Sequence, residues 1–240
     1  NKPSPIGMAF LLTVSDGHQS SRDTITVTIT DHLFPANGSQ FRDIANDTDT
    51  LSLDDSFTVT AWVRTTADTG NLDGKTPIVN KGGFGTDAEN SNMNYGIWMD
   101  CGALEVNPDC RGGNRIEAGF ESSNGTDVFV ETPIDIAYNT GKWYFVAVTF
   151  DGYKLKLYVN AVQVDGRTTR LQPDSEGAGP VRLGANSLYE SGGVYQPQYF
   201  TGDIDEVGIW NRALSREEVA SMYVSREIDD AGMILYDTLN

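Results

Sequence analysis

The chain has 240 residues, of which 39% are hydrophobic and 21% are charged, so it can bury a core and is not of a disordered composition. It carries 34 acidic and 17 basic side chains, and its formal net charge is -17. This charge argues against nucleic acid and anionic membranes as partners, because phosphate binding needs a basic surface. No apolar run approaches the roughly 20 residues of a membrane-spanning helix. An acidic surface suits divalent cations and extracellular surroundings.

Residues 1–35 predict a β-hairpin. Two alternating runs, residues 9–15 and 24–30, flank a turn that contains Asp16 and Gly17. Two strands cannot bury a core by themselves. They resemble the closing hairpin of an immunoglobulin-like repeat of the polycystic-kidney-disease or cadherin type, which implies a larger multidomain chain. The alternative is that they add strands to the main domain.

Strand patterns dominate residues 36–226. Phe57–Val63 and Tyr144–Phe150 alternate with β-branched and aromatic residues, and Asp151–Gly152 joins the second run to the next as a hairpin turn does. Short strands, regular turns and almost no helix predict an all-β fold, with two antiparallel sheets packed as a jelly-roll sandwich. Four tryptophans lie in strand patterns and are expected in the core: Trp62, Trp98, Trp143 and Trp210.

One short helix is predicted near the C-terminus. Ser215 and Glu218 form a capping box, and an apolar face follows at helical spacing from Val219. We expect this helix to pack on the edge of the sandwich. Residues 227–240 read either as a linker and the start of a following module or as a strand added to the sandwich.

Cys101 and Cys110 lie between two strand-like runs, where a disulfide would close a short loop and contribute about 2.5 to 3 kcal/mol. Two free thiols are the alternative. A disulfide implies an oxidising compartment. Glycosylation sequons begin at Asn37, Asn46 and Asn124, and they also favour an extracellular or cell-surface location.

The acidic stretch Asp203–Glu206 precedes the apolar end of a strand pattern and could be catalytic, metal-binding or structural. In a regular strand Asp205 shares a face with Val207 and Ile209, while Glu206 points the other way, so the two carboxylates cannot share a substrate. A carboxylate among apolar neighbours needs backbone donors, a cation or a basic side chain such as Arg212.

Seven segments follow one another in an order that resembles the concanavalin A-like lectin/glucanase superfamily, in its laminin-G-like branch, over residues 37–224. They are FTVTAWVR, IVNKG, YGIWM, GKWYFVAV, LYVNAVQV, VRLGAN and the segment from Phe200 to Tyr223. The resemblance implies a jelly roll whose rim loops carry function. The fold hosts hydrolases, lectins and adhesion modules, so function depends on the site.

The resemblance bears on catalysis and on calcium. Glucanases of this superfamily use Glu-x-Asp-x-x-Glu or Glu-x-Asp-x-Glu, which the acidic stretch does not match, so we predict no enzymatic activity. Laminin G domains hold calcium at a rim that corresponds here to Asp127, the backbone near Tyr199, and Asp203, beside which Asp205 is a further candidate. We therefore expect calcium as a cofactor.

A second candidate site is the loop from Lys81 to Gly96. Its acidic and amide side chains could bind an ion or a sugar, and a tyrosine from a later loop could stack on a pyranose ring. The residues predicted to bind ligand are Asp87, Glu89, Asn92, Asn94 and Tyr195.

These observations predict a non-catalytic extracellular module of a multidomain protein that binds a glycan or an extracellular protein through its rim loops, stabilised by calcium. We expect no nucleic-acid partner and no direct membrane insertion. One alternative is a divergent glycoside hydrolase. The other is a structural module of a surface array or filament, in which the N-terminal hairpin pairs with a neighbour's open sheet edge.

Overall fold

The computed structural model describes most of the chain. The described residues are 7–15, 20–28, 33–45, 51–65, 75–82, 93–100, 115–133, 138, 141–175, 180–185, 190–191, 194–195, 199–237 and 239.

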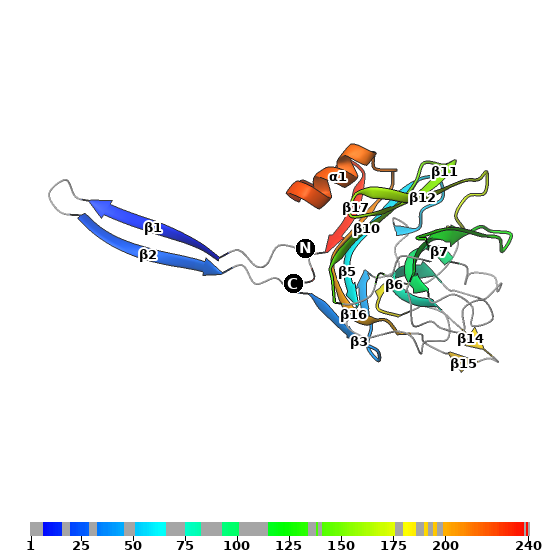
Figure 1. Cartoon of the computed structure of the whole chain (residues 1–240), viewed down its shortest axis with the longest axis horizontal. Helices are drawn as coiled ribbons and strands as arrows, with labels where there is room; N and C mark the ends of the chain where they lie inside the picture. Colours follow the sequence, from blue (N-terminus) through cyan, green and yellow to red (C-terminus); the bar gives the residue numbers. More distant parts are fainter. Residues whose placement is uncertain are drawn as a thin grey trace.

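Two antiparallel sheets pack face to face, which confirms the predicted jelly-roll sandwich (Figure 1). The seven-stranded sheet has the order β12 (Val162–Thr168), β11 (Lys154–Val159), β10 (Tyr144–Phe150), β5 (Phe57–Thr65), β16 (Thr201–Trp210) and β17 (Met233–Asp237), with β3 (Phe34–Asn37) also paired to β16. The six-stranded sheet has the order β4 (Arg42–Ala45), β13 (Val181–Leu183), β6 (Lys75–Gly82), β7 (Met93–Asp100), β8 (Arg115–Glu121) and β9 (Asp127–Glu131).

The core between the sheets follows from strand alternation, because every second side chain of a strand points to the same face. On β10, Val146, Val148 and Phe150 point inward and are fully buried. The Phe150 ring meets Phe120 of the other sheet at 4.9 Å between centroids, and Phe57 lies 6.2 Å from Phe120. Aromatic rings therefore join the two sheets at this end of the sandwich.

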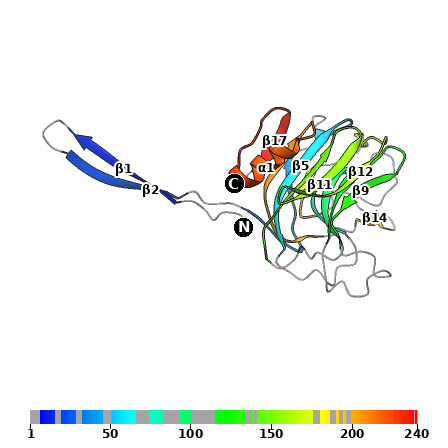
Figure 2. The ribbon, with the colours of Figure 1, turned by 45° about the horizontal axis from the view of Figure 1, so that its top comes forward.

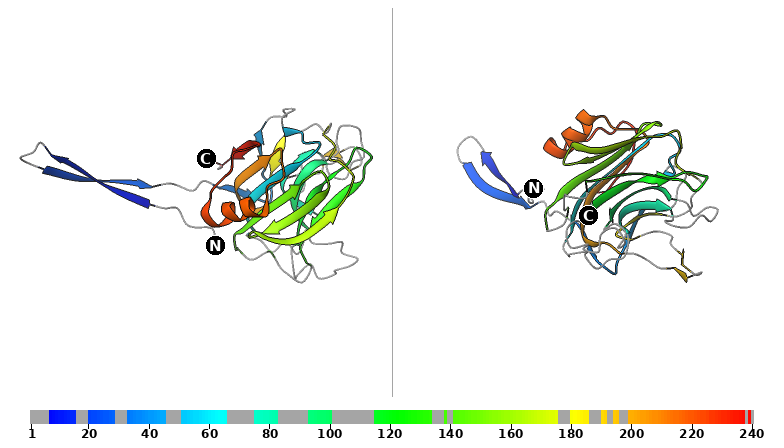
Figure 3. Two further views of the ribbon diagram at one scale, coloured as in Figure 1. Left: turned by 90° about the horizontal axis from the view of Figure 1, so that it is seen from above. Right: turned by 45° about the vertical axis from the view of Figure 1, so that its right-hand side comes forward.

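A second apolar layer lies outside the seven-stranded sheet, under α1 (Arg216–Ser225). Trp62 and Trp210 are buried there against Val219 and Met222 of the helix, and Tyr223 stacks on Trp62 at 5.7 Å. Figures 2 and 3 show α1 on the face of this sheet that points away from the six-stranded sheet. The helix thus covers a face, where an edge was predicted, because these large side chains need a cover.

Local signals in the sequence act as predicted. The Ser215 hydroxyl accepts a hydrogen bond from the Glu218 N–H, and the Glu218 carboxylate accepts one from the Ser215 N–H, which confirms the capping box. At the β10–β11 turn, the Asp151 carboxylate accepts hydrogen bonds from the N–H groups of Tyr153 and Lys154. Each signal needs only residues within one turn of chain.

The two ends differ. Strands β1 (Gly7–Ser15) and β2 (Ser20–Thr28) pair with each other as the predicted hairpin, which extends away from the sandwich in Figure 1. Its assignment to an immunoglobulin-like repeat stays a prediction. At the other end β17 pairs with β16, so residues 233–237 add a strand to the sandwich.

A two-stranded ladder also joins β14 (Glu190–Ser191) to β15 (Val194–Tyr195). Among the described residues, no helix has the length and apolar character to cross a membrane.

Candidate functional site

A β-bulge changes which way the acidic stretch of β16 points. Asp205 lies opposite Trp62, and the register shifts before Gly208 pairs with Thr60. Glu206 takes a positive φ of 47° at this shift. Ile204 and Val207 consequently both face the core between the sheets, and Asp205 faces the layer under α1. The prediction that Asp205 shares a face with Val207 is wrong, because the bulge adds a residue to the strand.

Arginines hold two of the three carboxylates. The Nε of Arg64 donates to Asp203 at 2.7 Å. Arg226 forms an ion pair with Glu206, and its guanidinium lies 4.2 Å from the centroid of the Trp62 ring. Arg226 therefore takes the place of Arg212, which the sequence suggested as the partner.

Asp205 itself is fully buried, and its carboxylate accepts a hydrogen bond of 2.8 Å from the N–H of Glu206. Burial also raises the pKa of Tyr236, whose hydroxyl lies 3.5 Å from the Glu206 carboxylate that raises it further. The stretch presents no pair of carboxylates to a saccharide in solvent. Its arrangement is that of a structural network.

The proposed calcium ligands are not brought together. Asp203 pairs with Arg64 near the end of β5, whereas Asp127 pairs with Glu121, next to the Phe120 ring that meets Phe57 at the start of β5. Positions 57 and 64 are seven steps apart along β5, which is about 23 Å at 3.3 Å per residue. One ion cannot bridge this distance. The described residues contain no cluster of three metal-ligating side chains of the His, Cys, Asp or Glu types.

Two other predicted residues have structural surroundings. Asn94 is fully buried, where its carboxamide bonds the N–H and C=O of Leu53 and the carbonyl of Asp174. These contacts tie β7 to two loops, and they leave Asn94 no path to a ligand in solvent. Tyr199 is half-buried and pairs with Ala185 in an isolated bridge beside β13.

The structure describes the other predicted site residues only in part. Asn124 is exposed in the β8–β9 turn, although its side-chain oxygen accepts hydrogen bonds from Ser122 and Thr126. For Asn37 of β3 and Tyr195 of β15 only the backbone is described. The other predicted residues lie outside the described part of the chain: Asp87, Glu89, Asn92, Cys101, Cys110 and Asn46. The disulfide and the acidic loop stay predictions.

The outer face of the six-stranded sheet, which points away from the seven-stranded sheet, carries an aromatic and charged group at its β4–β13 edge. Phe41 is 42% exposed, and the Arg182 guanidinium lies 3.8 Å from the centroid of its ring. Arg182 is opposite Asp43 in the ladder and donates two hydrogen bonds to its carboxylate, at 2.7 and 3.1 Å. We call Phe41, Asp43 and Arg182 the Phe41 cluster. A bidentate pair of this kind orients the guanidinium rigidly.

The middle of the same face is filled by Trp98. A Cβ at Gly96 would lie 2.4 Å from the indole, so the ring covers this glycine. The ring also meets Phe129 edge-on at 5.6 Å. Trp98 is fully buried, as predicted, but in this layer and not in the core between the sheets.

The far margin of this face is charged. Arg115 pairs with Asp100 at 3.2 Å and with Glu131 at 2.7 Å, across three neighbouring strands. The side chain of Glu131 is 48% exposed, and Asp100 is buried. Sequence reasoning missed the Phe41 cluster and this margin. The only signal was a lone aromatic residue in a polar stretch, Gln40–Phe41–Arg42–Asp43.

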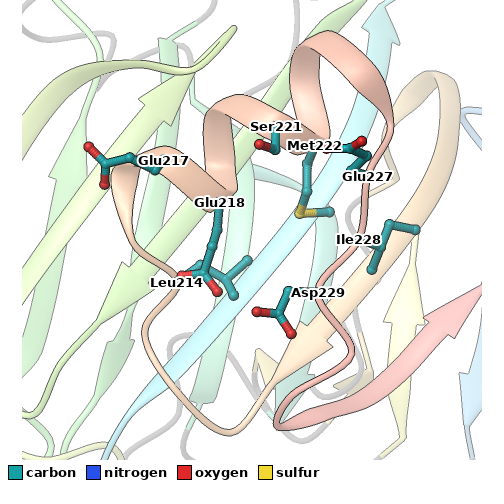
Figure 4. Close-up of a pocket in the computed structure, with 8 residues that line it drawn as sticks. All are labelled: Leu214, Glu217, Glu218, Ser221, Met222, Glu227, Ile228 and Asp229. Atoms are coloured by element: carbon teal, nitrogen blue, oxygen red, sulfur yellow. The ribbon is translucent and has the colours of Figure 1, made fainter.

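A separate pocket of about 300 Å³ lies beside α1 (Figure 4). Its apolar lining includes Leu214 and Met222, and its carboxylates include Glu217 and Glu218. A hydrogen bond from Arg212 is the main cause that lowers the pKa of Glu218 to about 2. Glu218 is therefore ionised near neutral pH and cannot serve as a general acid.

Comparison with known proteins places the sandwich among similar folds. A family model described as the concanavalin A-like lectin/glucanases superfamily matches residues 37–220. A heptameric SAP-like pentraxin from Limulus polyphemus is similar with a TM-score of 0.57 and 15% identity, over 85% of this chain and 90% of its own. The CBM40 of a Ruminococcus gnavus sialidase, bound to α2,3 sialyllactose, has a TM-score of 0.59 and 14% identity, over 80% of this chain and 96% of its own.

An enzyme also has a similar structure. A mutant of the NanB sialidase from Streptococcus pneumoniae has a TM-score of 0.53 and 17% identity, over 79% of this chain and 27% of its own. At such identities the similarity establishes the fold alone. No curated protein sequence matches the chain.

Proposed function

The chain belongs to the concanavalin A-like lectin/glucanases superfamily, and from this premise we propose that it is a non-catalytic module that binds a glycan. We place the glycan on the outer face of the six-stranded sheet, at the Phe41 cluster. The fold by itself does not choose among the lectins, hydrolases and adhesion modules that share it. The choice depends on the chemistry of this cluster.

The observation that carries the proposal is an exposed aromatic ring fixed next to a rigid charged pair. Arg182 covers one face of the Phe41 ring, and the other face is a flat apolar surface on which a pyranose ring can stack. Arg182 donates and Asp43 accepts hydrogen bonds, as sugar hydroxyls require, and their mutual bonds fix both side chains before a ligand arrives. Preorganisation of this kind lowers the entropy cost of binding.

Two further observations support binding over catalysis. Arg64 and Arg226 hold Asp203 and Glu206, and Asp205 is buried, so these carboxylates brace the sandwich. The similarity to the Ruminococcus gnavus CBM40, which is bound to a sialyllactose, extends over 96% of that CBM40. The similarity to the NanB sialidase extends over only 27% of that enzyme.

The proposal also covers the cellular location of the module and its cofactor. We place the module outside the cell or at its surface, within a multidomain protein, and a protein partner at the rim loops is the alternative ligand. Calcium stays part of the proposal only through the acidic loop with Asp87 and Glu89, since Asp127 and Asp203 lie at opposite ends of the sandwich. A calcium-dependent melting temperature would support this loop as the site.

A glycan array tests the proposal. The intact chain should bind at least one oligosaccharide, and Phe41→Ala should weaken that binding about fivefold to tenfold, because a stacking surface is lost. Binding is then quantified by isothermal titration with the best oligosaccharide, with calcium and with a chelator.

Tyr153→Ala is the matched control. Tyr153 is also an exposed aromatic residue, 51% accessible, but it lies in the β10–β11 turn of the other sheet. Equal loss in both variants, or no loss in Phe41→Ala, would contradict the assignment of the site. Release of reducing sugar by the intact chain would contradict a non-catalytic role.

A further inference from the structure

Basic side chains gather around a pocket of about 300 Å³ on the edge strand β12 and its neighbour β11. This is unexpected in a chain with a net charge of -17. Three of its lining residues are cationic, and the others contribute an amide, a hydroxyl and backbone: Lys154, Lys156, Arg167, Gln163, Thr168, Gly166 and Leu155. We call this the β11–β12 pocket.

Its shape follows from the strand ladder. Lys154 and Lys156 are two residues apart on β11 and therefore project from the same face, while Leu155 between them points into the core. Opposite them on β12 are Thr168 and Gly166. A Cβ at Gly166 would lie 3.0 Å from the side-chain nitrogen of Gln163, so the glycine leaves room for this amide on the same face of β12.

The cationic side chains that line this pocket are not paired with carboxylates in the described part of the chain. Within the described part of the chain, Lys154, Lys156 and Arg167 make no ion pair, in contrast to the paired arginines 64, 182 and 226. Two nearby carboxylates, those of Asp165 and Asp151, already accept hydrogen bonds from backbone N–H groups. Asp165 accepts hydrogen bonds from the N–H groups of Gly166 and Glu131, and Asp151 accepts those of its own turn.

We propose that the β11–β12 pocket binds the anionic group of an acidic saccharide, either a sulfate ester or a carboxylate. The ammonium groups of Lys154 and Lys156, the Gln163 amide nitrogen and the Thr168 hydroxyl can donate hydrogen bonds to its oxygens, and charge-assisted bonds of this kind are strong. Arg167 is opposite Leu155 in the ladder, so its side chain projects from the other face of these strands. No aromatic side chain lines the pocket, so recognition rests on charge and not on ring stacking.

The expected ligand carries few negative charges. Two lysines on a strongly acidic chain attract one anionic group, but a long polyanion would meet the negative remainder of the surface. The pocket lies on the other sheet from the Phe41 cluster, so the two sites can be tested separately.

Titration of the intact chain with glucose 6-sulfate, glucuronate and glucose tests this assignment. We expect the two acidic sugars to shift the amide resonance of Gly166 and glucose to leave it unchanged, and the affinity should fall as salt rises. The double variant Lys154→Gln/Lys156→Gln should weaken the acidic sugars about tenfold or more. The comparison of sulfate with carboxylate identifies the anion.

Lys142→Gln is the matched control, since Lys142 is exposed before β10 and outside the pocket. Equal binding of glucose, unchanged affinity in the double variant, or inorganic sulfate that binds as tightly as the sugar sulfate would each overturn the assignment. Phe41→Ala should leave the acidic sugars bound here unaffected. A failure of the Phe41 site is thereby distinguishable from a failure of this one.

Discussion

Single arginines form ion pairs with three carboxylates of this sandwich. Arg64 holds Asp203, Arg226 holds Glu206, and Arg212 holds Glu218. A partly buried carboxylate is costly without a counter-charge, and the guanidinium also supplies several donors. Asp203 and Glu206, which the sequence offered as catalytic, metal-binding or structural residues, consequently form ion pairs within the scaffold.

Glu218 predicts a pH dependence of stability. Its pKa is lower in the folded chain, about 2, than the ordinary 4.5, so its contribution is present above the ordinary value and is lost as the pH falls toward 2. Near neutral pH, Glu218→Gln should lower the free energy of unfolding by about 1 kcal/mol, because the ion pair with Arg212 is lost. The difference from the unmodified chain should shrink as the pH falls from about 4.5 and vanish only below about pH 2, as measured by urea unfolding.

Glu217→Gln is the control for this prediction. Glu217 is the preceding residue in the same helical turn, but it is exposed and makes no ion pair among the described residues. Its substitution should change stability by less than about 0.5 kcal/mol at any pH. A pH-independent difference between Glu218→Gln and the unmodified chain would contradict the proposed origin of the effect.

At the scale of elements, the bulge in β16 connects a strand to a helix. Glu206 leaves the regular ladder and meets Arg226, which ends α1 in a left-handed conformation with φ of 59°. The guanidinium of Arg226 also lies against Trp62 of β5. One residue thus joins α1, β5 and β16, and the bulge is what brings its partner within reach.

A double-mutant cycle measures this connection. Glu206→Gln, Arg226→Gln and the double variant should give a coupling of about 1 kcal/mol in unfolding free energy, since the pair is only partly exposed. The same cycle with Arg216→Gln, at the exposed start of the helix, should give a coupling near zero. A coupling near zero for Arg226 would show that the pair adds nothing beyond the individual side chains.

At the scale of the molecule, the N-terminal hairpin and the C-terminal segment differ in how they pair with the sandwich. The strand pairing of β1 in the described structure is with β2. By contrast, β17 pairs with β16, Asp237 forms an ion pair with Arg42, and the indole N–H of Trp210 donates to the carbonyl of Asp229. The C-terminal segment is therefore integral to the sandwich.

Two deletions test this difference. Removal of residues 1–32 should change the melting temperature of the sandwich by less than about 3 °C, whereas removal of residues 227–240 should lower it by about 6 °C or more, because a paired strand is lost. Differential scanning calorimetry measures both. Comparable losses would contradict an independent hairpin. Size-exclusion chromatography of the first variant also tests the array alternative, in which loss of the hairpin abolishes assembly.

The sequence by itself determined the features that depend on near neighbours. Period-two runs such as Tyr144–Phe150 become strands, and Ser215 with Glu218 caps the helix, because alternation and capping act within a few residues. The ordered series of strand segments also predicted the sandwich, since each apolar face requires a partner sheet.

Only the tertiary structure decided how side chains meet. The bulge at Glu206 reverses the face of Asp205 relative to Val207, and an added residue of this kind leaves no mark on the hydrophobic pattern. Asp43 and Arg182 are 139 residues apart in the chain, yet they form a pair because β4 and β13 lie side by side. Pairing of distant strands, which no local pattern specifies, therefore decided where this chain braces its fold and where the proposed glycan site lies.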